Sequence, residues 1–132
     1  MNRRQATLLL ALGVSGTLAC GDKNGPSGPV AGDLTVSYSS PSVSDGALLL
    51  LIQGGPVASV RAAGSQQVAS ASAGVNLQRV VVTGDLTSGD ILRIAVPDVA
   101  AVASYAVQVE AAADRTTFSL NDPVSYRATV RR

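Results

Sequence analysis

The sequence has no His and no Trp, a single Cys, and three Tyr and one Phe as its aromatic residues. Without His, the commonest general base and the commonest metal ligand are both missing. One Cys forms neither an internal disulfide nor a thiolate metal site. Ser nucleophiles lack an ordinary base, since the one Lys, Lys23, lies near the start of the chain. We therefore expect a protein that is not an enzyme and that uses no cofactor.

Charge is also scarce. Ten Lys and Arg residues oppose nine Asp and Glu residues, which gives a formal net charge of +1. This balance provides no electrostatic footprint for nucleic acid. Hydrophobic residues make up 46% of the chain, so its low charge does not indicate disorder. The length suits one small domain.

The first 19 residues have the features of a secretory signal segment. Arg3 and Arg4 give it a positive start, and residues 6–19 are uncharged. This uncharged stretch is shorter than the ~20 residues that a membrane-spanning helix needs. The paired arginines leave a twin-arginine export route open as an alternative.

The end of this segment, Thr17-Leu18-Ala19-Cys20, resembles the lipobox of bacterial lipoproteins. In that family a small residue precedes the Cys that becomes lipid-modified and N-terminal. The resemblance implies a signal peptide over residues 1–19 and a diacylglyceryl group on Cys20. The protein would then be held on a membrane of the bacterial cell envelope by its acyl chains. An ordinary secretory signal, with a Cys there by chance, is the alternative.

Residues 20–32 are expected to be the lipidated Cys and a flexible tether. Residues 21–32 read GDKNGPSGPVAG, a composition too rich in Gly and Pro to order itself. As a flexible coil, this segment has a root-mean-square reach of roughly 20 Å. Removal of Arg3 and Arg4 with the signal peptide leaves no polybasic stretch in the sequence, so we expect the acyl chains to anchor the protein alone.

Residues 33–132 alternate between apolar and polar side chains in the way that half-buried strands do. The expected inward residues are Leu34, Val36, Tyr38, Tyr105, Val107, Val109, Ala111, Val124, Tyr126, Ala128 and Val130. Three other runs, residues 47–52, 80–82 and 91–96, are apolar almost throughout and are typical of central strands. Residues 48–52 in particular must be covered or central, because such a run at an exposed edge pairs with other chains.

Turn residues separate these runs, at 44–46, 54–56, 73–74, 87–90 and 121–123. Candidate strands begin near residues 34, 47, 57, 67, 77, 91, 105 and 124, and residues 97–103 suit a short helical crossover. The sequence therefore predicts an all-β domain, an antiparallel sandwich of about eight strands.

Two stretches carry a family resemblance. Residues 103–107, with Tyr105 at their centre, resemble the tyrosine-corner strand of immunoglobulin-like domains. Asp122 and Tyr126 offer the same corner on the last strand. The layout of residues 34–130 also resembles a shortened cohesin domain, through the turn at 45–46 and the segment 88–94. These resemblances imply an immunoglobulin-like or cohesin-like sandwich and carry no ligand with them.

Two sets of charged residues are candidate sites. Asp85 and Asp90 flank a tight loop, where they suit turn formation, with a weak calcium contact as the alternative and no metal expected. Arg61, Arg79 and Arg93, together with Arg127, lie in predicted strands. Should several share one exposed sheet face, they would form a basic patch suited to acidic partners.

These features favour a non-catalytic envelope protein that binds or scaffolds another envelope protein. The alternative is a carrier, anchored or secreted, of a small apolar ligand or a glycan, although the few aromatic residues argue against the glycan. An exposed apolar sheet face would favour the first function, and an enclosed cavity the second.

Overall fold

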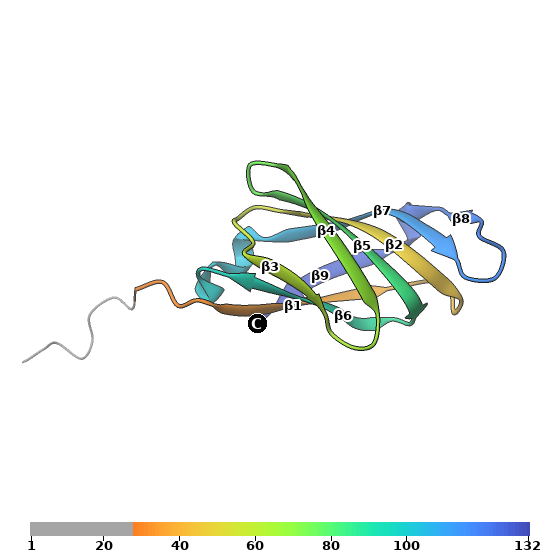
Figure 1. Cartoon of the computed structure of the whole chain (residues 1–132), viewed down its shortest axis with the longest axis horizontal. Helices are drawn as coiled ribbons and strands as arrows, with labels where there is room; N and C mark the ends of the chain where they lie inside the picture. The colour runs from red at the N-terminus through yellow and green to blue at the C-terminus, as the bar shows by residue number, and fades with distance from the viewer. Residues whose placement is uncertain (1–27) are drawn as a thin grey trace, which may run out of the picture.

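The computed structural model describes residues 28–132; the signal segment and Cys20 lie outside the described residues. The described part is an all-β antiparallel sandwich of nine strands in two sheets, as the alternating pattern predicted (Figure 1). One sheet has the order β3-β6-β1-β9 and the other β4-β5-β2-β7-β8.

The strands of the four-stranded sheet are β1 (Gly32–Ser39), β3 (Ser59–Ala62), β6 (Gly89–Val96) and β9 (Arg127–Arg131). Those of the five-stranded sheet are β2 (Asp45–Gln53), β4 (Gln67–Gly74), β5 (Leu77–Leu86), β7 (Ala106–Asp114) and β8 (Leu120–Asn121). The three apolar runs are central, since β2, β5 and β6 each have a neighbour on both sides. The prediction for residues 48–52 is confirmed: β2 lies between β5 and β7, and Leu48, Leu50 and Ile52 are buried.

The core between the sheets is made almost entirely of aliphatic side chains. It consists of Leu34, Val36, Tyr38, Leu48, Leu50, Ile52, Val80, Val82, Leu86, Ile91, Leu92, Ile94, Val96, Tyr105, Val109, Ala112 and Tyr126. All three Tyr point inward, as predicted. Their phenol rings supply all of the aromatic surface that this core contains, because the single Phe is exposed.

The predicted helical crossover is present as the 3₁₀ helix η1 (Val99–Ser104). Asp98 caps it by accepting a hydrogen bond from the Ala100 amide at 3.0 Å. The same carboxylate accepts from the Val30 amide, and the Val30 carbonyl accepts from the Val99 amide at 2.8 Å. These bonds fix the point at which the chain enters β1.

Two predicted inward positions are wrong. Ala111 was expected inside, but the pairing of β2 with β7 shifts between Leu49 and Leu50, so that Glu110 is an extra residue and Ala112 faces the core instead. Val124 was also expected inside and is 67% exposed. It lies in the 3₁₀ helix η2 (Pro123–Ser125), and β9 begins only at Arg127.

Neither tyrosine forms the expected corner, in which the hydroxyl bonds to backbone a few residues upstream. The Tyr105 hydroxyl donates to the Pro56 carbonyl at 2.7 Å, far away in sequence. The Tyr126 hydroxyl donates to the Asp45 carboxylate at 2.6 Å. Both tyrosines therefore link distant segments across the sandwich.

Candidate docking surface

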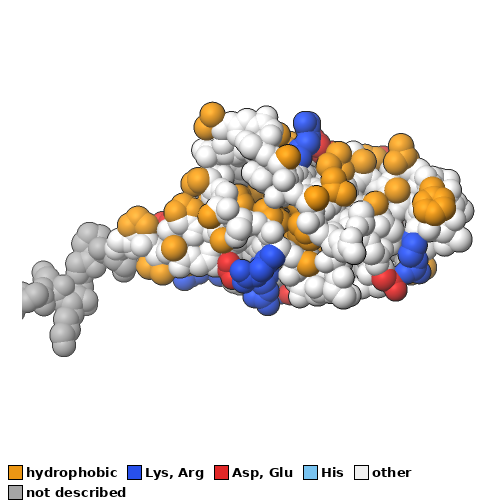
Figure 2. Space-filling view, viewed as in Figure 1, with side chains coloured by type: hydrophobic (Ala, Val, Ile, Leu, Met, Phe, Trp, Pro, Cys, Tyr) orange, Lys and Arg blue, Asp and Glu red, His pale blue; other side chains and the backbone are white. Residues whose placement is uncertain are grey.

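The outer side of the five-stranded sheet carries a continuous set of apolar side chains, which we call the apolar face. Side chains alternate along a strand, so the residues between the core positions of β2 point outward. Leu49 lies opposite Val81 of β5 and Ala111 of β7. The apolar face consists of Ala47, Leu49, Val81, Ala111, Ala113 and Leu120. Figure 2 shows apolar side chains, in orange, over the region of β5, β2 and β7.

The apolar face has two shallow depressions. A depression of about 160 Å³ is lined by its six residues together with Leu48 and Ala112. A second depression of about 170 Å³ adjoins it, lined by Gly46, Ala47, Ala113, Asp114, Arg115 and Phe118. Small alanine side chains beside larger ones produce this relief, which suits the insertion of a partner's side chains.

Ion pairs flank the apolar face. Arg79 Nε donates to Glu110 Oε2 at 2.9 Å, and Arg79 Nη2 to Glu110 Oε1 at 3.4 Å. Arg115 pairs with Asp85 near the other end. A polar rim around an apolar centre is the usual anatomy of a protein–protein interface.

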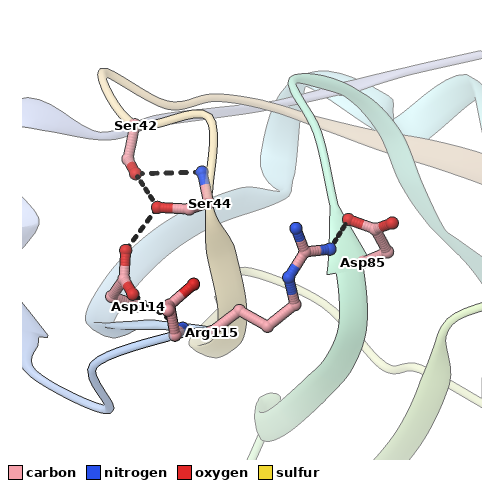
Figure 3. Close-up of polar contacts among 6 residues, drawn as sticks. Ser42, Ser44, Asp85, Asp114 and Arg115 are labelled. Atoms are coloured by element: carbon pink, nitrogen blue, oxygen red, sulfur yellow. Dashed lines mark hydrogen bonds and ion pairs between the residues drawn. The ribbon is translucent and has the colours of Figure 1, made fainter.

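The turn between β7 and β8 is built on Asp114, as Figure 3 shows in part. The Asp114 carboxylate accepts hydrogen bonds from the amides of Thr116 and Thr117 at 2.7 and 2.8 Å and from the Ser44 hydroxyl. The Ser44 bond, followed by the two amides, lowers the pKa of Asp114 to about 2. Arg115, next along the chain, donates its amide to the Ser44 carbonyl at 2.7 Å. The turn is therefore tied to the start of β2.

This turn presents Phe118, the one Phe of the chain, to solvent. Phe118 is 83% exposed and has a φ of 57°, a left-handed conformation that costs a bulky residue roughly 1–2 kcal/mol. Leu120, two residues later, is 79% exposed. Backbone strain that presents an aromatic side chain to water gives no gain in stability and is typical of a functional position.

Comparison with known proteins supplies no relative for this arrangement. No protein-family model, curated protein or solved structure matches the chain. The role of the apolar face therefore follows from its own residues.

The acidic residues singled out in the sequence are not brought together. Asp85 bonds to Arg115, whereas Asp90 accepts from the Ser37 hydroxyl and from Arg131 at 2.6 Å. Across residues 28–132, no group of three or more His, Cys, Asp or Glu side chains is placed to hold a metal ion. The same residues include no helix long and apolar enough to cross a membrane.

The strand arginines divide between the two sheets. Arg61, Arg93 and Arg127 point outward from the four-stranded sheet, and Arg131 joins them there. Arg79 lies on the five-stranded sheet, beside Glu110. Of the four strand arginines that the sequence suggested could share one sheet face, three do so, and Arg79 does not.

A buried polar cluster centred on Asp45 was not predicted from the sequence. This residue was assigned to a turn, but it begins β2 and is fully buried. Its carboxylate accepts hydrogen bonds from the Tyr126 hydroxyl at 2.6 Å, from Asn121 Nδ2 at 3.3 Å and from the Ser40 hydroxyl. Every donor comes from a different segment, so the cluster closes one end of the sandwich.

Proposed function

We propose that this chain is a non-catalytic, lipid-anchored protein of the bacterial cell envelope whose sandwich binds or scaffolds another envelope protein. The observation that carries the proposal is the apolar face, which includes the exposed Leu120 and has Phe118 exposed beside it. Contiguous apolar surface framed by charged residues marks an interaction site in a small protein. The two-sheet antiparallel layout supports an immunoglobulin-like or cohesin-like assignment as part of this proposal.

Phe118 is the residue on which we expect most of the binding energy to depend. Exposed aromatic side chains that a partner buries are typical hot spots, and truncating one costs 2 kcal/mol or more. The turn holds the backbone at Phe118 through Asp114, whose carbonyl accepts from the Phe118 amide at 3.1 Å, so little backbone freedom remains to be lost on binding.

The second candidate, carriage of a small apolar ligand, rests on a groove of about 550 Å³ near the start of β1. It is lined by Ala31, Gly32, Asp33, Pro56, Val57, Ala58, Ala95, Val96 and Pro97. This groove lies on the surface, whereas the space between the sheets is filled by the core side chains. A ligand that co-purifies with the protein and is lost on changing Val57→Asp would favour carriage over docking.

The lipid anchor is tested by expressing the full chain in a bacterium beside a Cys20→Ser variant. We expect the wild-type chain to lose residues 1–19, gain the mass of a diacylglyceryl group and sediment with membranes. The variant should lack that mass and leave the membrane fraction in buffer of high ionic strength, because two acyl chains anchor the protein there and salt screens the attraction between basic side chains and anionic lipid. A soluble and unmodified wild-type chain would refute the anchor.

Docking is tested with a photo-activatable amino acid at Leu120, with the same group at Thr129 on the opposite sheet as its control. We expect a discrete adduct with one envelope protein from position 120 only. Phe118→Asn should weaken that adduct roughly thirtyfold, since Asn tolerates the left-handed backbone and only the aromatic contact is lost.

Val75→Asn provides the matched control for Phe118→Asn, because Val75 is 91% exposed in the turn between β4 and β5. It should leave the adduct unchanged. Equal adducts from positions 120 and 129, or an adduct indifferent to Phe118→Asn, would contradict docking at the apolar face. An adduct with a second copy of this chain would show that the apolar face mediates self-association and does not bind another envelope protein.

A further inference from the structure

The outer side of the four-stranded sheet carries three arginines in one line across its strands. Arg61 of β3 pairs with Arg93 of β6, Arg93 pairs with Thr35 of β1, and Thr35 pairs with Arg131 of β9. We call Arg61, Arg93 and Arg131 the arginine row. Neighbouring strands lie about 4.8 Å apart, so the row spans roughly 14 Å. In Figure 2 basic side chains, in blue, gather beside β3 with a red carboxylate next to them.

The carboxylates on this side do not neutralise the row. Arg61 pairs with Asp33, and Arg131 pairs with Asp90 at 2.6 Å. Arg93, between them, makes no ion pair with any carboxylate of residues 28–132 and lies directly opposite Arg61. Its charge does reach Asp90, whose pKa it helps to lower after the Ser37 and Arg131 hydrogen bonds. Like charges opposite each other in adjacent strands destabilise a sheet, and an external anion relieves that repulsion.

The remaining charge on this side is positive. Arg127 also points outward from β9, so four arginines stand against Asp33 and Asp90, which leaves +2. Both ion pairs are solvent-exposed, and such pairs contribute little and exchange readily for another anion. Guanidinium groups hold phosphate oxygens in two parallel hydrogen bonds, which makes Arg well suited to phosphate.

The row lies close to the point where the domain joins the preceding chain. Thr35, in the middle of the row, is three residues beyond Gly32, the first residue of β1, a distance of about 10 Å along the strand. The hydrogen bonds between Val30 and the Asp98–Val99 segment fix this entry point. Residues 28–31 lead into β1 at one end of the sandwich (Figure 1).

We propose that the arginine row binds the phosphate groups of anionic lipids, so that the four-stranded sheet faces the membrane and the apolar face points away from it. The orientation rests on the lipid anchor of the proposed function, since Cys20 would hold the domain within reach of lipid headgroups. Because the two sheets are opposite sides of one sandwich, contact through the row leaves Phe118 and the apolar face free for a protein partner. The row thus supplies the basic patch that the linear sequence lacks.

The test uses the full chain with Cys20→Ser, so that binding does not depend on acyl chains. Its binding to phosphatidylcholine vesicles is compared with binding to vesicles that also contain phosphatidylglycerol. The row variant carries Arg61→Gln and Arg93→Gln, and the control carries Arg79→Gln and Arg115→Gln on the other sheet. Both variants lose the same charge and keep the same leader, and circular dichroism verifies that each is folded.

We expect binding to the anionic vesicles that weakens with salt and falls roughly tenfold in the row variant while the control changes little. An equal loss of vesicle binding in both variants would show that net charge, and not the arginine row, causes the binding, and would overturn the proposal. Equal binding to anionic and neutral vesicles would overturn it as well. Binding to polyglutamate but not to vesicles would assign the row to an acidic protein instead. If Cys20 is not acylated in the bacterium but the row still binds anionic vesicles, the proposed lipid anchor is wrong and the lipid-binding role of the row stands.

Discussion

Replacing Tyr126 with Phe should lower the free energy of unfolding by about 2 kcal/mol, because it removes a hydrogen bond to a buried carboxylate. The Tyr126 hydroxyl donates to Asp45, which has no solvent exposure. Without that donor, Asp45 keeps Asn121 at 3.3 Å and the Ser40 hydroxyl as its side-chain partners. A buried carboxylate that loses one of its donors recovers no water in exchange, so the whole desolvation cost remains.

The other two tyrosines provide matched controls for the same chemical change. Tyr105→Phe removes a bond to the neutral Pro56 carbonyl and should cost about 1 kcal/mol. Tyr38→Phe should cost nothing or stabilise the protein, since the buried Tyr38 hydroxyl has no hydrogen-bond partner among residues 28–132. Each substitution deletes the same hydroxyl oxygen, so the differences in the free energy of unfolding reflect the hydrogen-bond partner that each hydroxyl has.

Urea denaturation followed by circular dichroism measures these differences. At about 4–8 °C per kcal/mol for a domain of this size, Tyr126→Phe should also lower the melting temperature by roughly 10 °C. A loss for Tyr126→Phe no larger than for Tyr38→Phe would contradict the role given to the Asp45 cluster.

Strand positions could be predicted from the sequence because this chain marks them in two independent ways. Residues 34–38 alternate strictly, and turn residues such as 54–56 interrupt the apolar runs. Where the alternation or the turn residues are missing, the position of the strand or of its side chains is predicted wrongly. The two-residue strand β8 has no alternation to detect, and the extra Glu110 in β7 reverses the side-chain phase without changing the local pattern.

The candidate surfaces were harder to predict, since they depend on which strands become neighbours. Arg61 and Arg93 are distant in sequence and meet through the pairing of β3 with β6. Asp45 precedes a Gly and has the local features of a turn residue; only the packing of Tyr126 against it makes it part of the core. Leu49 belongs to an apolar run that predicted a central strand, and β2 is central, yet no element of residues 28–132 covers the outer side of Leu49.

Stability should fall steeply in alkali, because the folded protein keeps all three phenols protonated. Burial raises the pKa of Tyr38 far above its ordinary value, with the negative charge of Asp45 adding to it. Burial, and then the hydrogen bond to Asp45, raises the pKa of Tyr126, and burial also raises that of Tyr105. In the unfolded chain each phenol loses its proton near pH 10.

Well below pH 10 both states hold these protons and the stability is complete. Above pH 10 the unfolded chain releases them first, so the free energy of unfolding falls, at up to about 1.4 kcal/mol per pH unit for each tyrosine that stays protonated in the folded protein. The loss continues until the raised pKa values are reached. Urea denaturation at pH 8, 10 and 11 measures this slope, and absorbance at 295 nm follows phenol ionisation without interference from Trp.

We expect the absorbance at 295 nm and the loss of the β-sheet circular dichroism signal to change together above pH 10. Tyr38→Phe removes the phenol whose pKa is raised furthest, so the slope of this variant should be clearly shallower than that of the wild type. A phenol that ionises near pH 10 while the β-sheet signal is intact would contradict the burial of that ring. The variants also separate the two roles of the tyrosines: Tyr38 would be dispensable at neutral pH and yet contribute to the alkaline loss, whereas Tyr126 would matter at both.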